Sequence, residues 1–443
     1  MRKGGRQTVK ENEKTYFCID MKSFYASVEC AERRLDPMTT HLVVADPSRG
    51  KNALCLAVSP SLKAKGVRNR CRLSEIPKNL DYLIAPPRMR LYVDYAAAIY
   101  GVYLRYFDPR DLHVYSIDES FLDVTSYLTL YRTDRLSLAK KLMREIEETT
   151  GIPSTAGIGT NLYLAKIALD ITAKHAPDRI GVLDEATYRA TLWEHTPITD
   201  FWQISTGTAS RLLSHGITTM RGIAQAPEEM LYRIFGVNAE LLIDHAFGRE
   251  SCRMEDIKNY RAQSHSLSFS QILPRDYSFE EARTVLSEML LHGAQEMLKR
   301  RLVSPKIGIM LGCSGEMELS AKGSERLGSA TNLPSRVCPC GLRLFDRIAP
   351  RDRKIRRLAV TFENLGDEAR EEFDLFTDTA AVERERAKER AVLSLAGKYG
   401  KNAVLRGTDL LECATQRERN EMIGGHRAGY DDTRTTGEAI RPL

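Results

Sequence analysis

The feature that most restricts this chain is a set of acidic residues placed where predicted β-strands end. Residues 15–19 (TYFCI) form a short apolar run rich in β-forming side chains, and Asp20 follows it. Such a run indicates a buried strand that delivers an acid at its end. In residues 112–124 (LHVYSIDESFLDV), strand-like sequence flanks Asp118 and Glu119, which predicts a β-hairpin with a polar tip. Adjacent strands of one sheet would bring the three carboxylates together.

These acids suit divalent-metal chemistry. Mg²⁺ prefers carboxylates, waters and phosphate oxygens. Phosphoryl transfer to a nucleotide uses two such ions, one activating the attacking hydroxyl and one neutralising the leaving pyrophosphate. Taken singly, an Asp at a strand end usually caps a helix or lies in a loop, and Asp-Glu at a hairpin tip is usually solvated turn chemistry. The pattern alone leaves both interpretations open.

The elements around the acids predict a ferredoxin-like core. Helix-compatible spacing begins at Phe24, and a later helix with one apolar stripe ends at Gly151. A short strand (STAGIG) and another helix, from about Asn161, follow. Strand, helix, hairpin, helix and strand make a split βαβ arrangement. Residues 31–86, which mix strand-like pieces with a basic stretch, form an insertion in it.

The remaining sequence divides into a helical segment and a second α+β domain. Within residues 187–250, ISTGTASRLL followed by HGI resembles a helix-hairpin-helix, in which backbone N–H groups meet a DNA phosphate. The candidate DNA contacts are Ser205, Gly207 and Arg211. Glycine normally stands where this chain has Ser205, so a plain α-hairpin is the alternative. Farther on, alternating strands and an amphipathic helix at residues 279–302 predict a small α+β domain.

Charge and cysteine usage narrow the class of protein. Of the 443 residues 42% are hydrophobic and 28% charged, and no run is long enough to span a bilayer. Nine scattered cysteines, with only Cys338 and Cys340 close together, favour a reduced, cytoplasmic protein without a zinc site.

The charge is unevenly distributed along the chain. Residues 322–357 carry ten Lys/Arg against three Asp/Glu, which indicates either a surface that binds a polyanion or a basic face exposed to solvent. Residues 363–390 reverse this balance, with five against ten.

Several motifs resemble those of the Y-family of translesion DNA polymerases. They are YFCIDMKSFYASVEC at residues 16–30 and YSIDESFLDVT at 115–125, with VSPSLKAKGV between them and GIGTNLYLAKIALDITAK after them. The similarity runs in order from about residue 15 to about residue 365. Within VSPSLKAKGV, the Ser-Pro and Ala-Lys-Gly sequences resemble those of the bacterial SOS-mutagenesis, polymerase V-like branch of the family. TQRERNEMIGGHRAG resembles UV-damage repair proteins of plasmids and phages of Gram-positive bacteria.

The resemblance implies a right-hand polymerase of the α+β class that performs low-fidelity synthesis past damaged bases. Its substrates would be primer-template DNA and dNTPs, and it would be a monomer without membrane contact. The implied parts are a flexible arm (1–14), a ferredoxin-like palm (15–30 and 87–180), small fingers (31–86), a helical thumb with the helix-hairpin-helix (181–250), a linker (251–262), an α+β little finger (263–365) and a tail (366–443).

The resemblance also assigns roles in the active site. Asp20, Asp118 and Glu119 match the catalytic carboxylates that hold two Mg²⁺ ions, and the carbonyl of Met21 matches a further ligand. The implied nucleotide contacts are Phe24, Tyr25, Ser59, Lys63 and Lys166. Among these, Tyr25 matches the steric gate that collides with a 2′-hydroxyl, the alternative being that Phe24 and Tyr25 are core aromatics. Lys63 and Lys166 match triphosphate contacts.

Some positions depart from the family pattern. Pro60 and Lys63 stand where many relatives have Tyr and Arg, so a point charge replaces a bidentate grip, and the Ser59 hydroxyl is the expected compensation. Lys22 stands where several relatives have an acid. None of these departures removes one of the three carboxylates.

A short peptide in the predicted tail resembles the segment with which bacterial polymerases dock on the sliding clamp. It is EFDLF at residues 372–376, with Phe373, Leu375 and Phe376 as the apolar contacts. Glu372 stands where the family usually has Gln. The alternative is an apolar anchor that folds back on the protein itself.

Two other function classes share parts of this pattern. A nucleotide cyclase has a ferredoxin-like palm with metal-binding carboxylates but needs no basic domain or clamp peptide. A non-catalytic DNA-binding accessory protein keeps the basic surfaces but tolerates loss of Asp118 or Glu119.

Overall fold

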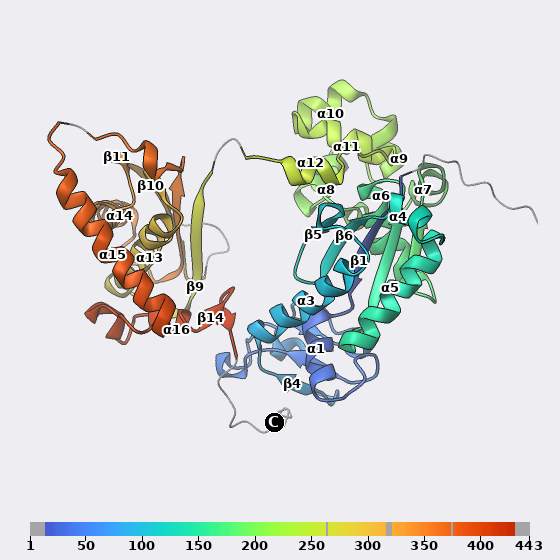
Figure 1. The fold of residues 1–443 in the computed structure, drawn as a ribbon, viewed down its shortest axis with the longest axis horizontal. Coiled ribbons are helices and arrows are strands. Elements are labelled where there is room, and N and C mark those ends of the chain that lie inside the picture. Colours follow the sequence, from blue (N-terminus) through green and yellow to red (C-terminus); the bar gives the residue numbers. More distant parts are fainter. Residues whose placement is uncertain (1–13, 263–264, 316–320, 374, 430–443) are drawn as a thin grey trace, which may run out of the picture. The chain divides into compact units, whose positions relative to one another are not determined.

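The computed structural model describes residues 14–262, 265–315, 321–373 and 375–429. The chain forms two compact units, one reaching Tyr260 and the other comprising Arg261–Ala428 (Figure 1). Most of the predicted N-terminal arm, residues 1–13, and the end of the predicted tail, residues 430–443, lie outside the described residues. No described helix is both long enough and apolar enough to cross a membrane.

A five-stranded sheet organises the first unit. Its strand order is β5 (Leu112–Val114), β6 (Glu119–Asp123), β1 (Tyr16–Met21), β7 (Ser154–Gly159) and β8 (Ile180–Leu183). The central strand β1 is antiparallel to both neighbours and almost entirely buried. Strands β5 and β6 pair as the predicted hairpin. The helices beside this sheet are α3 (Met89–Leu104), α4 (Thr125–Leu130), α5 (Arg135–Thr150) and α6 (Leu162–Ile167).

The insertion after β1 has its own small sheet and core. Helix α1 (Phe24–Glu32) leads to β2 (Leu42–Val44), β3 (Ala57–Val58), α2 (Pro60–Ala64) and β4 (Leu83–Ala85). The strands lie in the order β3-β2-β4. Buried apolar side chains, including those of Val43, Val58 and Leu62, fill the space under α2.

Six helices complete the described part of the first unit. They are α7 (Glu185–Leu192), α8 (Thr206–Leu213), α9 (Met220–Gln225), α10 (Glu228–Phe235), α11 (Asn238–Ala246) and α12 (Met254–Asn259). Helices α7 to α11 pack around a common apolar cluster. Helix α12 lies in the segment expected to be a linker, but Met254 is buried against Tyr16 and Phe121. The segment therefore belongs to the first unit up to Tyr260, because Met254, with the partly buried Cys252 and Ile257, packs against that unit.

The second unit is a separate α+β body, as the sequence predicts. Its sheet has the order β11 (Ala321–Thr331), β10 (Leu302–Cys313), β12 (Ile355–Glu363) and β9 (Leu267–Tyr277), and β13 (Gly366–Asp367) pairs with the start of β10. Helices α13 (Phe279–Lys299) and α14 (Pro334–Ile348) share a large apolar core with the sheet. Alternate residues such as Ile307, Ile309 and Leu311 point into that core, which leaves the other face of the sheet open.

The segment expected to be a tail is folded as far as Ala428. It contains α15 (Thr379–Tyr399), α16 (Gln416–Arg419), β14 (Met422–Ile423) and β15 (His426–Arg427). Glu288 of α13 accepts hydrogen bonds from the amides of Thr415 and Gln416 at 3.0 and 3.1 Å. The charge-dense pattern of residues 380–399 predicts a helix, which is α15, and acids of the preceding turn form ion pairs with it.

Candidate active site

Backbone pairing brings the three predicted carboxylates to one end of the sheet. Asp20 and Glu119 are direct partners across the antiparallel pair β1–β6. The amide of Met21 donates to the carbonyl of Asp118 at 3.0 Å. At the hairpin tip, the Ser116 hydroxyl lies 2.6 Å from Oδ1 of Asp118. Residues nearly a hundred positions apart thus share one site because two strands pair in this register.

The electrostatics of this cluster suit a divalent cation. Burial, with the nearby charges of Asp118 and Glu119, raises the pKa of Asp20 to about 8. The site therefore has more negative charge than its surroundings neutralise, and its donors are the hard oxygens that Mg²⁺ prefers. Among the described side chains, no three Asp, Glu, His or Cys enclose a ready-made metal cage. An ion here would need further oxygens, such as those of water and substrate phosphates.

Lys166 lies beside the carboxylates. Its Nζ is 2.9 Å from Oε2 of Glu119 and 3.1 Å from Oδ1 of Asp170. Although burial alone would lower it, the pKa of Lys166 is raised above its usual range by Asp170 and Glu119. The other Glu119 oxygen, Oε1, accepts the Cys18 thiol at 3.1 Å. Both oxygens of Glu119 therefore have protein partners.

A glycine in β7 allows α6 to carry Lys166 into the site. A Cβ at Gly159 would lie 2.1 Å from the backbone nitrogen of Ala165, so only glycine permits this approach. Directly after α6, Ala168–Thr172 form a π-helical turn that contains Asp170, an irregularity common at functional sites. Cys18 and Asp170 are contacts that sequence reasoning missed, although the i, i+4 spacing of Lys166 and Asp170 is a signal for their pairing.

Lys63 and Ser59 have different surroundings. The exposed side chain of Lys63, on α2, is within electrostatic reach of Asp20 and Asp118; partial desolvation, together with Lys22, lowers its pKa. The Ser59 hydroxyl is fully buried and bonds the Leu42 amide at 3.1 Å. Lys63 is thus close enough to the carboxylates to sense their charge, whereas the Ser59 hydroxyl bonds within the insertion. Ser59 still supports Lys63, since its carbonyl accepts the Lys63 amide at the start of α2.

The two aromatic residues of α1 differ in exposure. Phe24 is buried, whereas Tyr25 is half-buried. The Tyr25 ring stacks on Tyr92, with centroids 4.5 Å apart and an interplanar angle of 17°. Burial and the charge of Asp118 raise the pKa of Tyr25. Tyr25 therefore presents a braced ring near the carboxylates, while Phe24 belongs to the core.

The predicted DNA-contact residues lie on an α-hairpin. Ser205 and Gly207 are at the start of α8, which a turn at Gly216 connects to α9. The guanidinium of Arg211 lies 4.6 Å from the centre of the Phe235 ring. The fold is that of two short helices joined by a tight turn, which suits both a helix-hairpin-helix and a plain α-hairpin.

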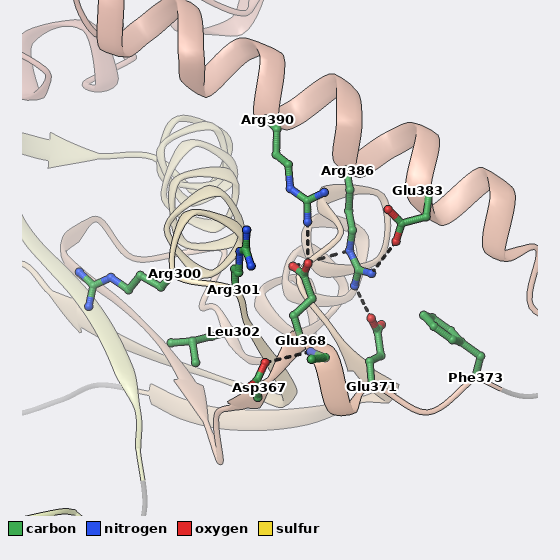
Figure 2. Close-up of a pocket in the computed structure, with 11 residues that line it drawn as sticks. Arg300, Arg301, Leu302, Asp367, Glu368, Glu371, Phe373, Glu383, Arg386 and Arg390 are labelled. Atoms are coloured by element: carbon green, nitrogen blue, oxygen red, sulfur yellow. Dashed lines mark hydrogen bonds and ion pairs between the residues drawn. The ribbon is translucent and has the colours of Figure 1, made fainter.

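A polar cavity of about 910 Å³ lies beside the predicted docking peptide in the second unit (Figure 2). Its lining includes Arg386 and Arg390 of α15, together with Glu368, Glu371 and Phe373. Leu375 and Phe376 are 99% and 95% exposed, and Phe373 is 40% exposed. These exposures favour a docking peptide over an anchor buried in the protein itself.

Known proteins resemble the chain along almost its whole length. Residues 19–170 match the impB/mucB/samB family, and residues 264–375 match the C-terminal domain of the same family. A Bacillus subtilis protein named for UV-damage repair, UvrX, is 30% identical over 425 residues, which are 94% of this chain and 98% of UvrX. The chain belongs to the Y-family of DNA polymerases.

Other Y-family proteins agree with this assignment. DNA polymerase IV 2 of Bacillus subtilis is 29% identical over 424 residues, 94% of this chain and 99% of the relative. A solved structure of a Y-family DNA polymerase chimera, Dbh-Dpo4(243-245)-Dbh, superposes with a TM-score of 0.63 at 21% identity, covering 79% of this chain and 98% of the chimera. The Y-family fold predicted from the sequence is therefore confirmed.

Proposed function

We propose that this Y-family member copies DNA past damaged bases with low fidelity, by transferring nucleotides from dNTPs to a primer 3′-hydroxyl. The observation that carries the proposal is the meeting of Asp20, Asp118 and Glu119 at one end of strands β1 and β6. The raised pKa of Asp20 supports it, because a cluster of acids that repel one another is suited to cations. The names of the relatives, UV-damage repair protein and DNA polymerase IV, are consistent with it.

The three acids would hold two Mg²⁺ ions with the carbonyl of Met21. When bound, the ions activate the primer hydroxyl and neutralise the leaving pyrophosphate. Lys63 would neutralise triphosphate charge from the side of α2. Lys166 would first orient Glu119 through its ion pair and would meet the triphosphate when substrate arrives.

Tyr25 would select the sugar. Its ring, braced by Tyr92, is positioned by α1 near Asp118. A ring under the sugar leaves no space for a 2′-hydroxyl, so ribonucleotides would be rejected by a clash and not by a missing hydrogen bond. Such steric rejection needs a rigid ring, which the stacking on Tyr92 supplies.

The open face of the second sheet would contact DNA. Gly308 pairs with Ser324 on one side and with Thr361 on the other, and Thr361 pairs with Ser268. This row of small residues is flanked on the same face by the exposed cations Lys322, Arg326 and Arg357. A flat surface with these cations lets a phosphate backbone approach closely and neutralises its charge. The start of α8, at Ser205 and Gly207, would supply a second backbone contact.

Phe373, Leu375 and Phe376 would dock into an apolar groove of a sliding clamp. The exposure of Leu375 and Phe376 supports this assignment. Attachment to a clamp raises the effective concentration of the enzyme at the primer end. The polymerase would act as a cytoplasmic monomer on clamp-loaded primer-template.

Primer extension across an abasic site tests the proposal. With dNTPs and Mg²⁺, the wild-type chain should extend past the lesion, and EDTA should abolish the reaction. Release of a cyclic nucleotide from ATP or GTP without DNA would favour a cyclase instead. DNA binding without any incorporation would favour an accessory protein.

A further inference from the structure

The segment just before the docking peptide is bound to α15 by a buried ion cluster. Glu368 begins a short 3₁₀-turn, Glu368–Arg370, and Glu371 follows it. Arg386 of α15 forms an ion pair with Glu371, and their side chains are only 4% and 2% exposed. Arg386 also lies 3.2 Å from Glu383 and 3.8 Å from Glu368. Figure 2 shows its guanidinium between these three acids.

Further contacts connect the cluster to the rest of the second unit. Nδ2 of Asn332 donates to Oε2 of Glu368 at 2.6 Å and to the Leu302 carbonyl at 3.0 Å. Nε of Arg386 donates to Oδ1 of Asn332 at 3.2 Å, and Arg390 donates to Glu368 at 2.6 Å. Buried charges whose hydrogen bonds are all satisfied favour a single geometry. Any movement that separates two partners would leave a buried charge unpaired, which costs free energy.

The other end of the docking peptide is also held. Oδ1 of Asp378 accepts the Ala381 amide at 2.9 Å and so caps the first turn of α15. The described apolar residues of the docking peptide, Phe373, Leu375 and Phe376, therefore lie in a short loop between Glu371 and Asp378. Both anchors of this loop are attached to the same helix.

We propose that Arg386 is a latch that fixes the base of this loop on α15, so that Phe373, Leu375 and Phe376 are presented by a constrained loop and not by a free tail. The inference rests on the proposed docking to a clamp. The partner of the docking peptide is a protein surface with an apolar groove, because the exposed side chains Leu375 and Phe376 are apolar. Constraint of the loop before binding lowers the conformational entropy lost on binding.

Two variants test the latch. Arg386→Met removes the guanidinium, and Glu371→Gln removes one charge from the loop side while leaving Glu368 and Glu383 beside Arg386. Lys388→Met is the matched control, since Lys388 is an exposed cation on the same helix. Full-length proteins are compared by hydrogen–deuterium exchange of the amides at 368–377 and by surface plasmon resonance on an immobilised bacterial sliding clamp.

Both latch variants should exchange faster at 368–377, with α13 and α14 unchanged, and should bind the clamp about three- to tenfold more weakly. Lys388→Met should match the wild type in both measurements. A synthetic peptide of residues 371–378 should bind more weakly than the full chain. Unchanged clamp affinity in both latch variants, while the wild type binds, would overturn the latch alone. Failure of the wild type to bind would overturn the docking function and the latch together.

Discussion

Nζ of Lys166 lies 2.9 Å from Oε2 of Glu119, and both side chains are only 9% exposed. A buried ion pair of this kind contributes little net stability, but removal of one member leaves an uncompensated charge. A substitution of Lys166 should therefore lower the stability of the fold and also disturb Glu119, the carboxylate proposed to act in catalysis.

Lys166→Met should destabilise the first unit by about 3 kcal/mol, because Glu119 and Asp170 lose their buried cation. Urea unfolding followed by tryptophan fluorescence measures this. Lys63→Met is the control, because Lys63 is exposed. The free energy of unfolding of this variant should differ from that of the wild type by less than about 0.5 kcal/mol, while the KM of the variant for dNTP rises. Equal stability of the two variants would contradict the arrangement.

Asp118→Ala and Glu119→Ala should each reduce kcat for primer extension by about 10²- to 10³-fold or more, because each removes a carboxylate from the proposed Mg²⁺ site. DNA affinity, measured by fluorescence anisotropy, should persist. Asp123→Asn is a matched control on the same strand, where the carboxylate bonds Thr125 outside the cluster. Extension that survives in both alanine variants would exclude the assigned site.

Tyr25→Ala should admit ribonucleotides, since no ring then lies under the sugar. The ratio of kcat/KM for dNTP over rNTP is expected to fall by at least about tenfold, the equivalent of ~1.4 kcal/mol. Tyr25→Phe keeps the ring and its stacking on Tyr92, so its selectivity should stay near that of the wild type. Unchanged selectivity in the alanine variant would show that Tyr25 is only a packing residue.

Asp20→Asn should change how stability depends on pH. The pKa of Asp20 rises from 3.8 to about 8 on folding, so the folded chain keeps a proton that the unfolded chain releases. The free energy of unfolding of the wild type therefore falls as the pH rises from about 4 to about 8, between the unfolded and the folded pKa of Asp20. In EDTA the variant should exceed the wild type at pH 9 by on the order of 2 kcal/mol, and much less at about pH 4. Urea unfolding at both pH values checks this, and Mg²⁺ should reduce the difference at pH 9. A pH-independent difference would refute the shift.

Lys322→Ala combined with Arg326→Ala should weaken DNA binding and reduce its salt dependence. Removal of one cation from a phosphate lowers the slope of log K against log salt by about 0.9, so the slope should decrease by roughly 2 when both are removed. Fluorescence anisotropy over a salt series measures it. Lys388→Ala, on α15, should leave the slope unchanged, and equal slopes in all three proteins would exclude the open sheet face as a DNA-binding surface.

Local sequence patterns predicted the strand before Asp20, the hairpin around Asp118 and the separate α+β unit. These elements depend on near neighbours, because a buried strand or hairpin leaves its apolar pattern and turn residues within about ten positions. The motifs that resemble the Y-family then related the three acids to one chemistry. The sequence thus determined which elements form and which residues are candidates for the site.

The tertiary structure alone decided what those residues touch. The pairing of Asp20 with Glu119, the two protein partners of Glu119 and the cluster around Arg386 all join residues from separate elements. The segment at 379–428 is held by partners far away along the chain, such as Glu288 on α13 and Gln271 on β9. Burial and electrostatic contacts act through space, so their partners cannot be found from spacing along the chain.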